Sequence, residues 1–471
     1  MDYKKLGFKC GIEIHQQLEG KKLFCNCPTE IRKNKPDFTF DRRLRASAGE
    51  SGKVDVAAAG EQQKNKLFTY WGYEDINCLV EMDEEPPNPV NQEALKIALQ
   101  VAQMMNCKII DKIQFMRKTV VDGSNTTGFQ RTAIIGRNGF IDVNGKKIGI
   151  AGVFLEEEAC QIMKRTANHD TYNLSRLGIP LLEIATDPDI SSPEECKETA
   201  AKIGMILRST GACKRGIGTI RQDVNVSIKG GARTETKGFQ DLKSIPKVVE
   251  NEVKRHLDLI KKKKKLQNEV RKAESDFSTT FLRLMPGAAR MYPETDIPTI
   301  KPELGTFKQI ETIEERIVRY KKSFGLNDDY ATLAVKYEDK EKVVLVEYFK
   351  KYKDHKFIVD FFTNIPKELK KRYNTKIDVK KIATEVFEKV ASGHMPKGSV
   401  IDLLADYSKT KKLPFDKFKV VSAGNMEKEI QIIAENNRGA PVGALMGMIM
   451  SKFKGKVDGK QAMQILQKYL R

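Results

Sequence analysis

The chain has few cysteines, no long apolar run and fewer acidic than basic residues. No stretch of 18 or more apolar residues occurs, which argues against a membrane-spanning helix. The first residues, MDYKKLGFKC, also lack the apolar segment of a secretory signal. The eight cysteines are scattered and none follows Cys213, so we expect no disulfide framework. Together these absences predict a cytoplasmic protein with no membrane partner.

The shortage of acidic residues gives the chain a large positive charge. It has 83 lysines and arginines against 63 aspartates and glutamates, a formal net charge of +20. Basic side chains bind phosphates favourably because they displace condensed counterions, so the charge points to a nucleic acid partner. Lysine enrichment also occurs in thermophilic proteomes for reasons unrelated to nucleic acids, and that alternative stays open.

The length and the order of the patterns indicate an α+β protein with several domains. A chain of 471 residues is too long for one ordinary core and suggests about three domains. Strand-like alternation and loops dominate up to about residue 300, together with helical patterns at 92–106, from a start within 187–195 to about 209, and at 245–268. Beyond about residue 303 every strong pattern is that of an amphipathic helix.

The stretch GIEIHQQL, residues 11–18, alternates apolar and polar side chains as a half-buried strand does. Ile12 and Ile14 then face a core, and Glu13 and His15 lie side by side on the opposite face. A carboxylate beside an imidazole is a possible half of a site for a hard metal ion. The alternative is an exposed strand face that carries an incidental histidine.

Two further segments place carboxylates in apolar surroundings. An apolar run at 149–155 ends in Glu156, Glu157 and Glu158, which repel one another and need a cation if they are buried. A solvated helix start is the alternative, since acids are favoured there. Glu183 interrupts an apolar strand, where a lone charge costs several kcal/mol, on the order of the penalty for an unpaired ion. We therefore expect Glu183 to have a partner.

A polar wall and a polar loop are candidate ligand-binding segments. One face of a predicted strand carries five hydrogen-bonding side chains: Thr219, Arg221, Asp223, Asn225 and Ser227. This suits a polar ligand cleft or an ordinary solvent face, and the next candidate strand adds Glu235 and Lys237. The loop DGSNTTGFQR, residues 122–131, has amides and hydroxyls that suit phosphate, with a plain hairpin loop as the alternative.

Seven motifs in order carry a family resemblance. They read GIEIHQQLEGKKLFCNC, CLVEMDEEPP, VVDGSNTTGFQRT, LEEEA, RLGIPLLEIATDPDI, GTIRQDVNVSIKGGAR and PGAARMYPETDIP. In this order they resemble the B/E family of tRNA-dependent amidotransferase subunits. The sequences of the motifs GSNTTGFQRT and PGAARMYPETDIP resemble the archaeal-type E subunits more closely than the bacterial B subunits.

The resemblance implies an architecture and a reaction. It implies a mixed-sheet, cradle-shaped catalytic domain at 1–302, an all-α helical domain at 303–400 and a small helical tail domain at 401–471 that holds tRNA. In this family the cradle uses ATP and Mg²⁺ to phosphorylate the side chain of glutamate misacylated onto tRNA(Gln). Ammonia then displaces the phosphate, and it arrives through a tunnel from an asparaginase-like partner, the D subunit, in a hetero-oligomer.

The resemblance also assigns site residues. Glu13, His15, Glu157 and Glu183 match the positions of the family's catalytic magnesium site, with Glu156 as a neighbour. The positions expected to line the cleft for nucleotide or aminoacyl substrate are Ser124, Asn125, Thr126, Gln130, Arg131, Arg221, Asp223, Asn225, Ser227, Glu235 and Lys237.

Two departures from the family pattern stand out. Bacterial B subunits often pair Cys-x-Cys with a later Cys-x-x-Cys, a spacing that suits zinc. Here Cys25, Cys27 and Cys78 are present, followed by Glu81, so a zinc site would have three thiolates and Glu81 or water. The inserted domain resembling aspartyl-tRNA synthetase, typical of the E subunits, is missing.

Two other functions remain open at this stage. A bacterial-type B subunit would work with separate A and C subunits and also accept Asp-tRNA(Asn). A tRNA-binding scaffold without catalysis would keep the basic surface, although it has no reason to keep buried acids that lower stability.

Overall fold

The computed structural model describes residues 1–45, 60, 62–239, 241–264, 266–285, 291–303, 310–341, 343–421, 423–453, 456–457 and 459–470. The chain forms two compact units, Met1–Thr312 and Ile313–Arg471. No helix in the described ranges is long and apolar enough to cross a membrane. The first five residues of the PGAARMYPETDIP motif lie outside these ranges.

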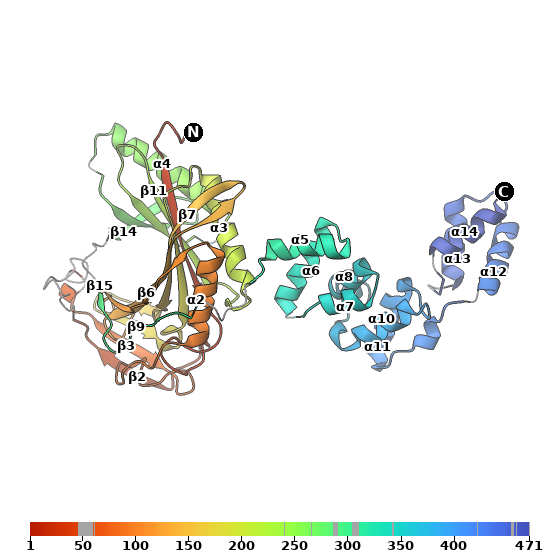
Figure 1. The fold of residues 1–471 in the computed structure, drawn as a ribbon, viewed down its shortest axis with the longest axis horizontal. Coiled ribbons are helices and arrows are strands. Elements are labelled where there is room, and N and C mark those ends of the chain that lie inside the picture. Colours follow the sequence, from red (N-terminus) through yellow and green to blue (C-terminus); the bar gives the residue numbers. More distant parts are fainter. Residues whose placement is uncertain are drawn as a thin grey trace. The chain divides into compact units, whose positions relative to one another are not determined.

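The first unit is built on a large mixed sheet (Figure 1). Its described strands run in the order β14-β13-β12-β11-β1-β10-β7-β6-β5-β15, with β4 paired to β6. Neighbours are antiparallel except β12 and β13, which are parallel. The strands are β1 (Lys9–Gln17), β4 (Lys108–Ile109), β5 (Met116–Thr119), β6 (Phe129–Val143), β7 (Lys146–Glu157), β10 (Pro180–Thr186), β11 (Ile220–Ser227), β12 (Thr234–Lys237), β13 (Glu269–Ala273), β14 (Thr279–Leu284) and β15 (Met291–Pro293).

Three helices pack against the apolar face of this sheet: α2 (Gln92–Met104), α3 (Pro193–Ser209) and α4 (Ser244–Lys261) (Figure 1). The predicted cap of α2 is confirmed, since the Asn91 side chain accepts hydrogen bonds from the amides of Glu93 and Ala94. On β1, Ile12 and Ile14 are buried as predicted, and α3 packs on β1. Glu13 and His15 therefore lie on the face opposite the helices.

A second, four-stranded sheet supports the polar loop at 122–128. Its order is β2 (Phe38–Arg42), β3 (Leu67–Gly72), β9 (His169–Asn173) and β8 (Gln161–Arg165). The rings of Tyr70 and Tyr172 stack in its core with centroids 5.9 Å apart. Their hydroxyls donate to the carbonyls of Gly123 (2.8 Å) and Asp122 (2.6 Å), which fixes the loop's first residues on this sheet.

Helix α4 is shorter than its sequence predicts. The sequence pattern predicts a helix to about Asn268, but α4 ends at Lys261, and Lys263 has a left-handed backbone with φ of 54°. Lys261 to Lys264 are exposed and contribute no apolar stripe that would hold further turns on the sheet. Lys265 lies outside the described residues. The chain instead enters β13 at Glu269, parallel to β12.

Glu252 on α4 is expected to be important for the stability of this unit. Its carboxylate is buried and accepts hydrogen bonds from Arg255 Nε (2.9 Å) and Thr279 Oγ1 (2.8 Å). Burial alone raises its pKa, but hydrogen bonds from His256 and Arg255 outweigh burial and lower the pKa of Glu252 to about 2. The resulting stabilisation is complete above the ordinary pKa of 4.5 and is lost as the pH falls toward 2.

We expect Glu252→Gln to lower the free energy of unfolding at pH 7 by about 3 kcal/mol, because Arg255 loses a buried partner. Urea unfolding followed by fluorescence measures this, since Trp71, the single tryptophan, lies on β3 of the same unit. Glu250→Gln, at an exposed pair with Lys254 on the same helix, should change it by less than about 0.5 kcal/mol. This role would be contradicted if both substitutions lowered the free energy of unfolding equally. It would also be contradicted if the difference between their effects were the same at pH 3 as at pH 7.

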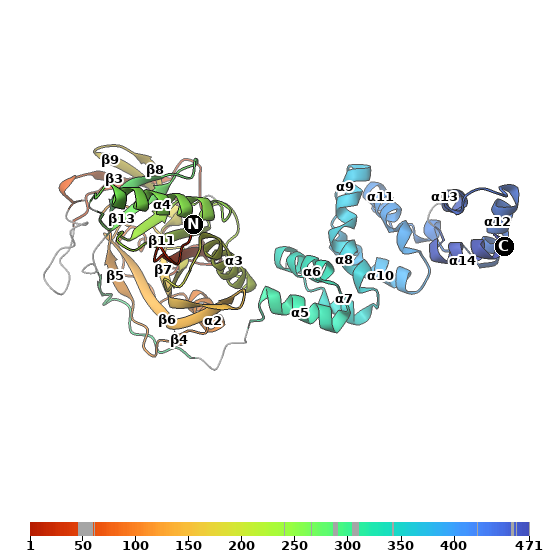
Figure 2. The ribbon, with the colours of Figure 1, turned by 90° about the horizontal axis from the view of Figure 1, so that it is seen from above.

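The second unit is helical throughout its described residues, as the sequence predicts (Figure 2). One hydrophobic cluster surrounds Phe361 and Phe387 and continues as far as Phe418, beyond the predicted boundary at residue 400. A separate cluster, from Met426 to Leu466, is formed by the last three helices. The helices are α5 (Ile313–Phe324), α6 (Asp328–Glu341), α7 (Val346–Lys351), α8 (His355–Thr363), α9 (Ile365–Tyr373), α10 (Ala383–Ala391), α11 (Val400–Thr410), α12 (Ala423–Asn436), α13 (Val442–Phe453) and α14 (Gly459–Tyr469).

Candidate active site on the open face of the sheet

Strand β1 lies between β10 and β11 and brings distant polar residues together. In the β1–β10 pairing His15 lies opposite Glu183, and in the β1–β11 pairing Glu13 lies opposite Asp223. Residues directly opposite in a sheet project from the same face, so these four side chains converge on the side away from the helices. The partner expected for Glu183 is therefore His15.

His15, Glu156 and Glu183 form the first of two acidic groups. Their possible ligand atoms all lie within 4.8 Å of one another. His15 Nε2 is 3.5 Å from Glu183 Oε2, and Lys118 Nζ is 2.9 Å from Glu156 Oε1. Burial would raise the pKa of Glu183, but the hydrogen bond from His15 outweighs it and lowers that pKa to about 2. The same contact raises the pKa of His15 although burial opposes it.

Glu13, Asp223 and Glu235 form the second acidic group, on β1, β11 and β12. Their carboxylate oxygens also lie within 4.8 Å of one another, and Lys237 pairs with Asp223 and Glu235. Asn225 Nδ2 donates to Glu13 Oε1 at 3.0 Å. Burial, followed by the charges of Glu183 and Glu235, raises the pKa of Glu13 to about 7. The predicted wall residues Asp223, Asn225, Glu235 and Lys237 thus meet at one place.

The two acidic groups carry more negative than positive charge. They contain five carboxylates, and the cationic side chains that form ion pairs with them are Lys118, Lys237 and Arg233, with His15 when it is protonated. Burial is the main cause of the raised pKa of Glu13, and this excess of negative charge raises it further. Carboxylate oxygens with one imidazole suit a hard divalent cation, so the donor set fits Mg²⁺.

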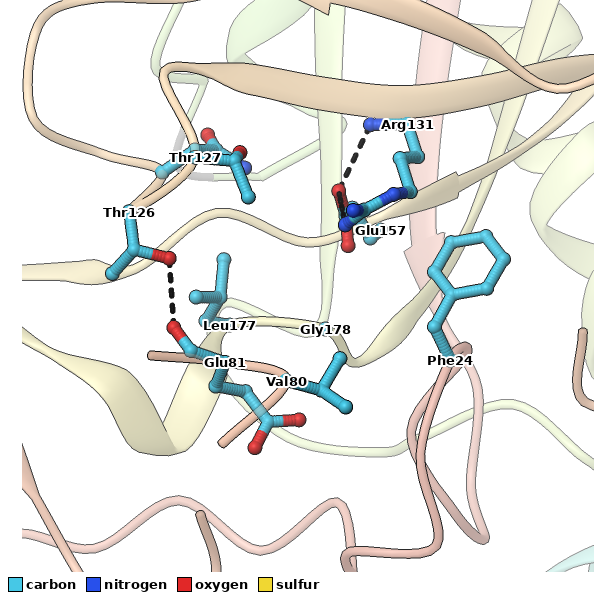
Figure 3. Close-up of a pocket in the computed structure, with 10 residues that line it drawn as sticks. Phe24, Val80, Glu81, Thr126, Thr127, Arg131, Glu157, Leu177 and Gly178 are labelled. Carbon is cyan, nitrogen blue, oxygen red and sulfur yellow. Dashed lines mark hydrogen bonds and ion pairs between the residues drawn. The ribbon is translucent and has the colours of Figure 1, made fainter. Parts of the chain in front are cut away.

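Glu157 lies elsewhere, and this corrects the predicted grouping. It follows Glu156 on β7, so its side chain projects from the opposite face of the strand. There it accepts a hydrogen bond from the Arg131 amide at 2.9 Å (Figure 3). Arg131 Nε pairs with Glu294 at 2.7 Å. The structure therefore brings Glu156, and not Glu157, to His15 and Glu183.

A buried polar chamber surrounds Glu157 and contains much of the loop predicted to line the cleft. Asn125 and Thr126 line it together with Arg131, and Thr126 Oγ1 donates to the Glu81 carbonyl at 2.7 Å (Figure 3). Ser124 donates instead to Asp122 within the loop. Gln130 alone among the five predicted residues of this segment reaches the acidic groups, by donating to Glu156 Oε2 at 3.1 Å.

The remaining predicted wall residues flank the acidic groups on β11. Arg221 donates to Glu158 at 3.0 Å. Burial would raise the pKa of Glu158, but the positive charges of Arg221 and Arg176 outweigh burial and, helped by the hydrogen bond from Gln17, lower that pKa. Ser227 lines a hollow of about 290 Å³. Arg233, which the sequence analysis did not identify, lines the same hollow and donates to Asn225 Oδ1 at 2.9 Å.

Three cysteines and Glu81 form a separate cluster within the first unit. Possible ligand atoms of Cys25, Cys27, Cys78 and Glu81 lie within 4.8 Å of one another. Cys25 Sγ is 2.8 Å from Glu81 Oε1, and a hydrogen bond from Cys25 lowers the pKa of Cys78 to about 7. Three sulfurs and one oxygen suit tetrahedral zinc, so the donor set fits Zn²⁺.

Comparison with known proteins identifies the fold that carries this site. Residues 8–306 match the model of the GatB/GatE catalytic domain. The chain belongs to the GatB/GatE family of amidotransferase subunits. All described strands of the GatB/GatE sheet, and both acidic groups, lie within the matched residues.

Several relatives of this GatB/GatE chain align along its whole length, and one more similar relative aligns with part of it. It is 34% identical to the E subunits of the glutamyl-tRNA(Gln) amidotransferases of Methanocaldococcus jannaschii and Archaeoglobus fulgidus, covering 100% of this chain and 99% of each relative. It is 52% identical to that of Thermococcus sibiricus over 266 residues, 56% of this chain and 42% of that relative. The first two alignments span 637 and 617 positions against 471 residues here. Those relatives therefore contain segments without a counterpart in this chain.

Proposed function

We propose that the chain is the subunit that activates and amidates glutamate on misacylated tRNA(Gln). ATP would phosphorylate the glutamate side chain, and ammonia would then displace phosphate to give glutaminyl-tRNA(Gln). The observation that carries this proposal is the convergence of two acidic groups around β1 inside the GatB/GatE catalytic domain. Full-length relatives named as the E subunit of a glutamyl-tRNA(Gln) amidotransferase support the substrate.

The protein's own residues would divide the work between binding and orientation. His15, Glu156, Glu183 and Glu13 would hold Mg²⁺, which offsets the negative charge that phosphoryl transfer brings together. Lys118 and Lys237 orient the carboxylates by direct ion pairs. Arg221 and Arg233, both partly exposed at the margin of the two groups, would pair with phosphate oxygens of ATP or of the tRNA end.

The proposal includes two partners and a second metal. The net charge of +20 suits tRNA. Ammonia would come from an asparaginase-like D subunit in a hetero-oligomer in the cytoplasm. Zn²⁺ would be held by Cys25, Cys27, Cys78 and Glu81, where it would connect the segment at 22–27 to the turn at 78–81 as a structural ion.

A single assay tests the proposed reaction. The purified protein is mixed with its co-purified partner, Mg-ATP and Glu-tRNA(Gln), and phosphate release is followed. We expect ATP cleavage to depend on Glu-tRNA(Gln) and to yield Gln-tRNA(Gln) when the partner and its amide donor are present. ATP cleavage that is not stimulated by Glu-tRNA(Gln) would overturn the proposal and leave a tRNA-binding scaffold.

The identity of the partner separates the archaeal E type of subunit from the bacterial B type. Tandem-affinity purification from the native cell should recover an asparaginase-like protein. Recovery of an amidase with a Ser-Ser-Lys triad, together with activity on Asp-tRNA(Asn), would assign the chain to the bacterial type instead.

A further inference from the structure

A groove in the second unit lies outside the residues assigned to the proposed reaction. It is lined by residues of α6, α8 and α9 and by residues 376–380, and its volume is about 820 Å³. Its apolar lining comes from Leu333, Tyr337, Phe362, Pro366, Ile377 and Val379. A concave apolar surface of this size is unusual for a face that contacts only water.

The rim of the groove is strongly basic. Its exposed lysines are Lys336, Lys340, Lys367, Lys370, Lys376 and Lys380. Lys380 and Lys340 share Glu341, at 2.8 and 3.3 Å. Among the described residues, no carboxylate lies within 4.0 Å of the other four ammonium groups. Asp378 is the other acid in the lining, so the groove carries an excess of positive charge.

We propose that this groove binds an acidic amphipathic helix of a protein partner. A helix in such a groove buries its apolar side chains, at spacings of three and four residues, against the floor. Its acidic face then lies beside the lysines on the rim, which would give the charge complementarity that fixes orientation and partner choice.

The floor distinguishes this occupant from nucleic acid. A phosphate backbone would satisfy the lysines, but it would leave the partly exposed aliphatic side chains of Leu333 and Ile377 facing polar sugar and phosphate groups. Single-stranded bases are held mainly by aromatic rings and arginine. The basic residues that line this groove are all lysines, and its one partly exposed aromatic ring is that of Tyr337. An acidic amphipathic helix would cover the apolar floor with its apolar side chains and pair its carboxylates with the lysines on the rim.

Fluorescence anisotropy with the full chain and a labelled peptide tests the proposal. The peptide has about four helical turns, with leucines on one face and glutamates on the others. A control peptide has the same composition, scrambled so that the leucines share no face. We expect the amphipathic peptide to bind at least about tenfold more tightly than the scrambled one, because only it can fill the floor.

Two sets of variants locate the binding. The first is a triple variant of the groove that combines Lys336→Glu, Lys367→Glu and Lys370→Glu, and it should weaken peptide binding about tenfold or more. The second is a control variant that combines Lys322→Glu, Lys350→Glu and Lys409→Glu at exposed positions outside the groove. The control should change peptide binding less than about twofold. Ile377→Ser should weaken binding of the amphipathic peptide and leave binding of the scrambled peptide unchanged. Thermal melts report whether each variant is folded. Equal binding of both peptides, or loss of tRNA binding in the groove variant with peptide binding unchanged, would overturn the proposal.

Discussion

The Glu156→Gln variant is expected to lose tRNA-stimulated ATP cleavage by roughly 100-fold to 1000-fold. Glu156 contributes a carboxylate to the group with His15 and Glu183, and it receives Lys118 Nζ at 2.9 Å. Glutamine keeps the shape and one acceptor oxygen but removes the charge that would hold Mg²⁺. Single-turnover ATP cleavage at saturating Mg²⁺ measures the loss.

The adjacent Glu157→Gln is the matched control, since the same substitution one residue later acts on the opposite face of β7. We expect ATP cleavage within about threefold of the unchanged protein, because Glu157 contacts Arg131 and not the acidic groups. Arg131 keeps its ion pair with Glu294 in this variant. Filter binding should show unchanged tRNA affinity for both variants. Loss of ATP cleavage in Glu157→Gln with activity retained in Glu156→Gln would place the metal site on the other face.

Alternation in the sequence was sufficient to predict the centre of this site. The period of two in residues 11–18 correctly separated the buried Ile12 and Ile14 from Glu13 and His15. The isolated charge of Glu183 correctly implied a partner, because a buried carboxylate requires one. The strand at 219–228 correctly predicted a polar wall, of which Asp223 and Asn225 reach Glu13 or its neighbours.

Alternation could not decide which of three consecutive glutamates faces the cleft. A shift of one residue in strand pairing exchanges the two faces, and the register of β7 with β10 is set by contacts distant in sequence. The position of the loop at 122–128 also depends on contacts distant in sequence. The sequence predicts it in the cleft, but the hydroxyls of Tyr70 and Tyr172 in the second sheet hold it beside the chamber of Glu157. Lys118 was not identified because a single lysine in a short strand has no local signature.

The cluster of Cys25, Cys27, Cys78 and Glu81 predicts a large effect of zinc on stability. The purified protein is expected to contain about one zinc ion per chain, since three sulfurs and a carboxylate lie within 4.8 Å of one another. Combined replacement Cys25→Ser and Cys27→Ser should remove the zinc and lower the melting temperature by several degrees, because a structural ion stabilises only the folded chain. Elemental analysis and calorimetry measure the two quantities. Cys107→Ser, a free cysteine outside the cluster, is the control and should change neither.

The substitution Glu81→Gln tests whether Glu81 or water is the fourth ligand of this zinc site. Glu81 Oε1 lies 2.8 Å from Cys25 Sγ and 3.6 Å from the buried ammonium of Lys22. If Glu81 binds the ion, its loss should weaken zinc affinity by roughly 10-fold to 100-fold in chelator competition, as loss of a ligand or of its support does elsewhere. An unchanged affinity would assign the fourth position to water and leave Glu81 as the partner of Lys22. Protein that contains no zinc after growth in zinc-supplemented medium would contradict the site altogether, because its thiols would then be satisfied by hydrogen bonds alone.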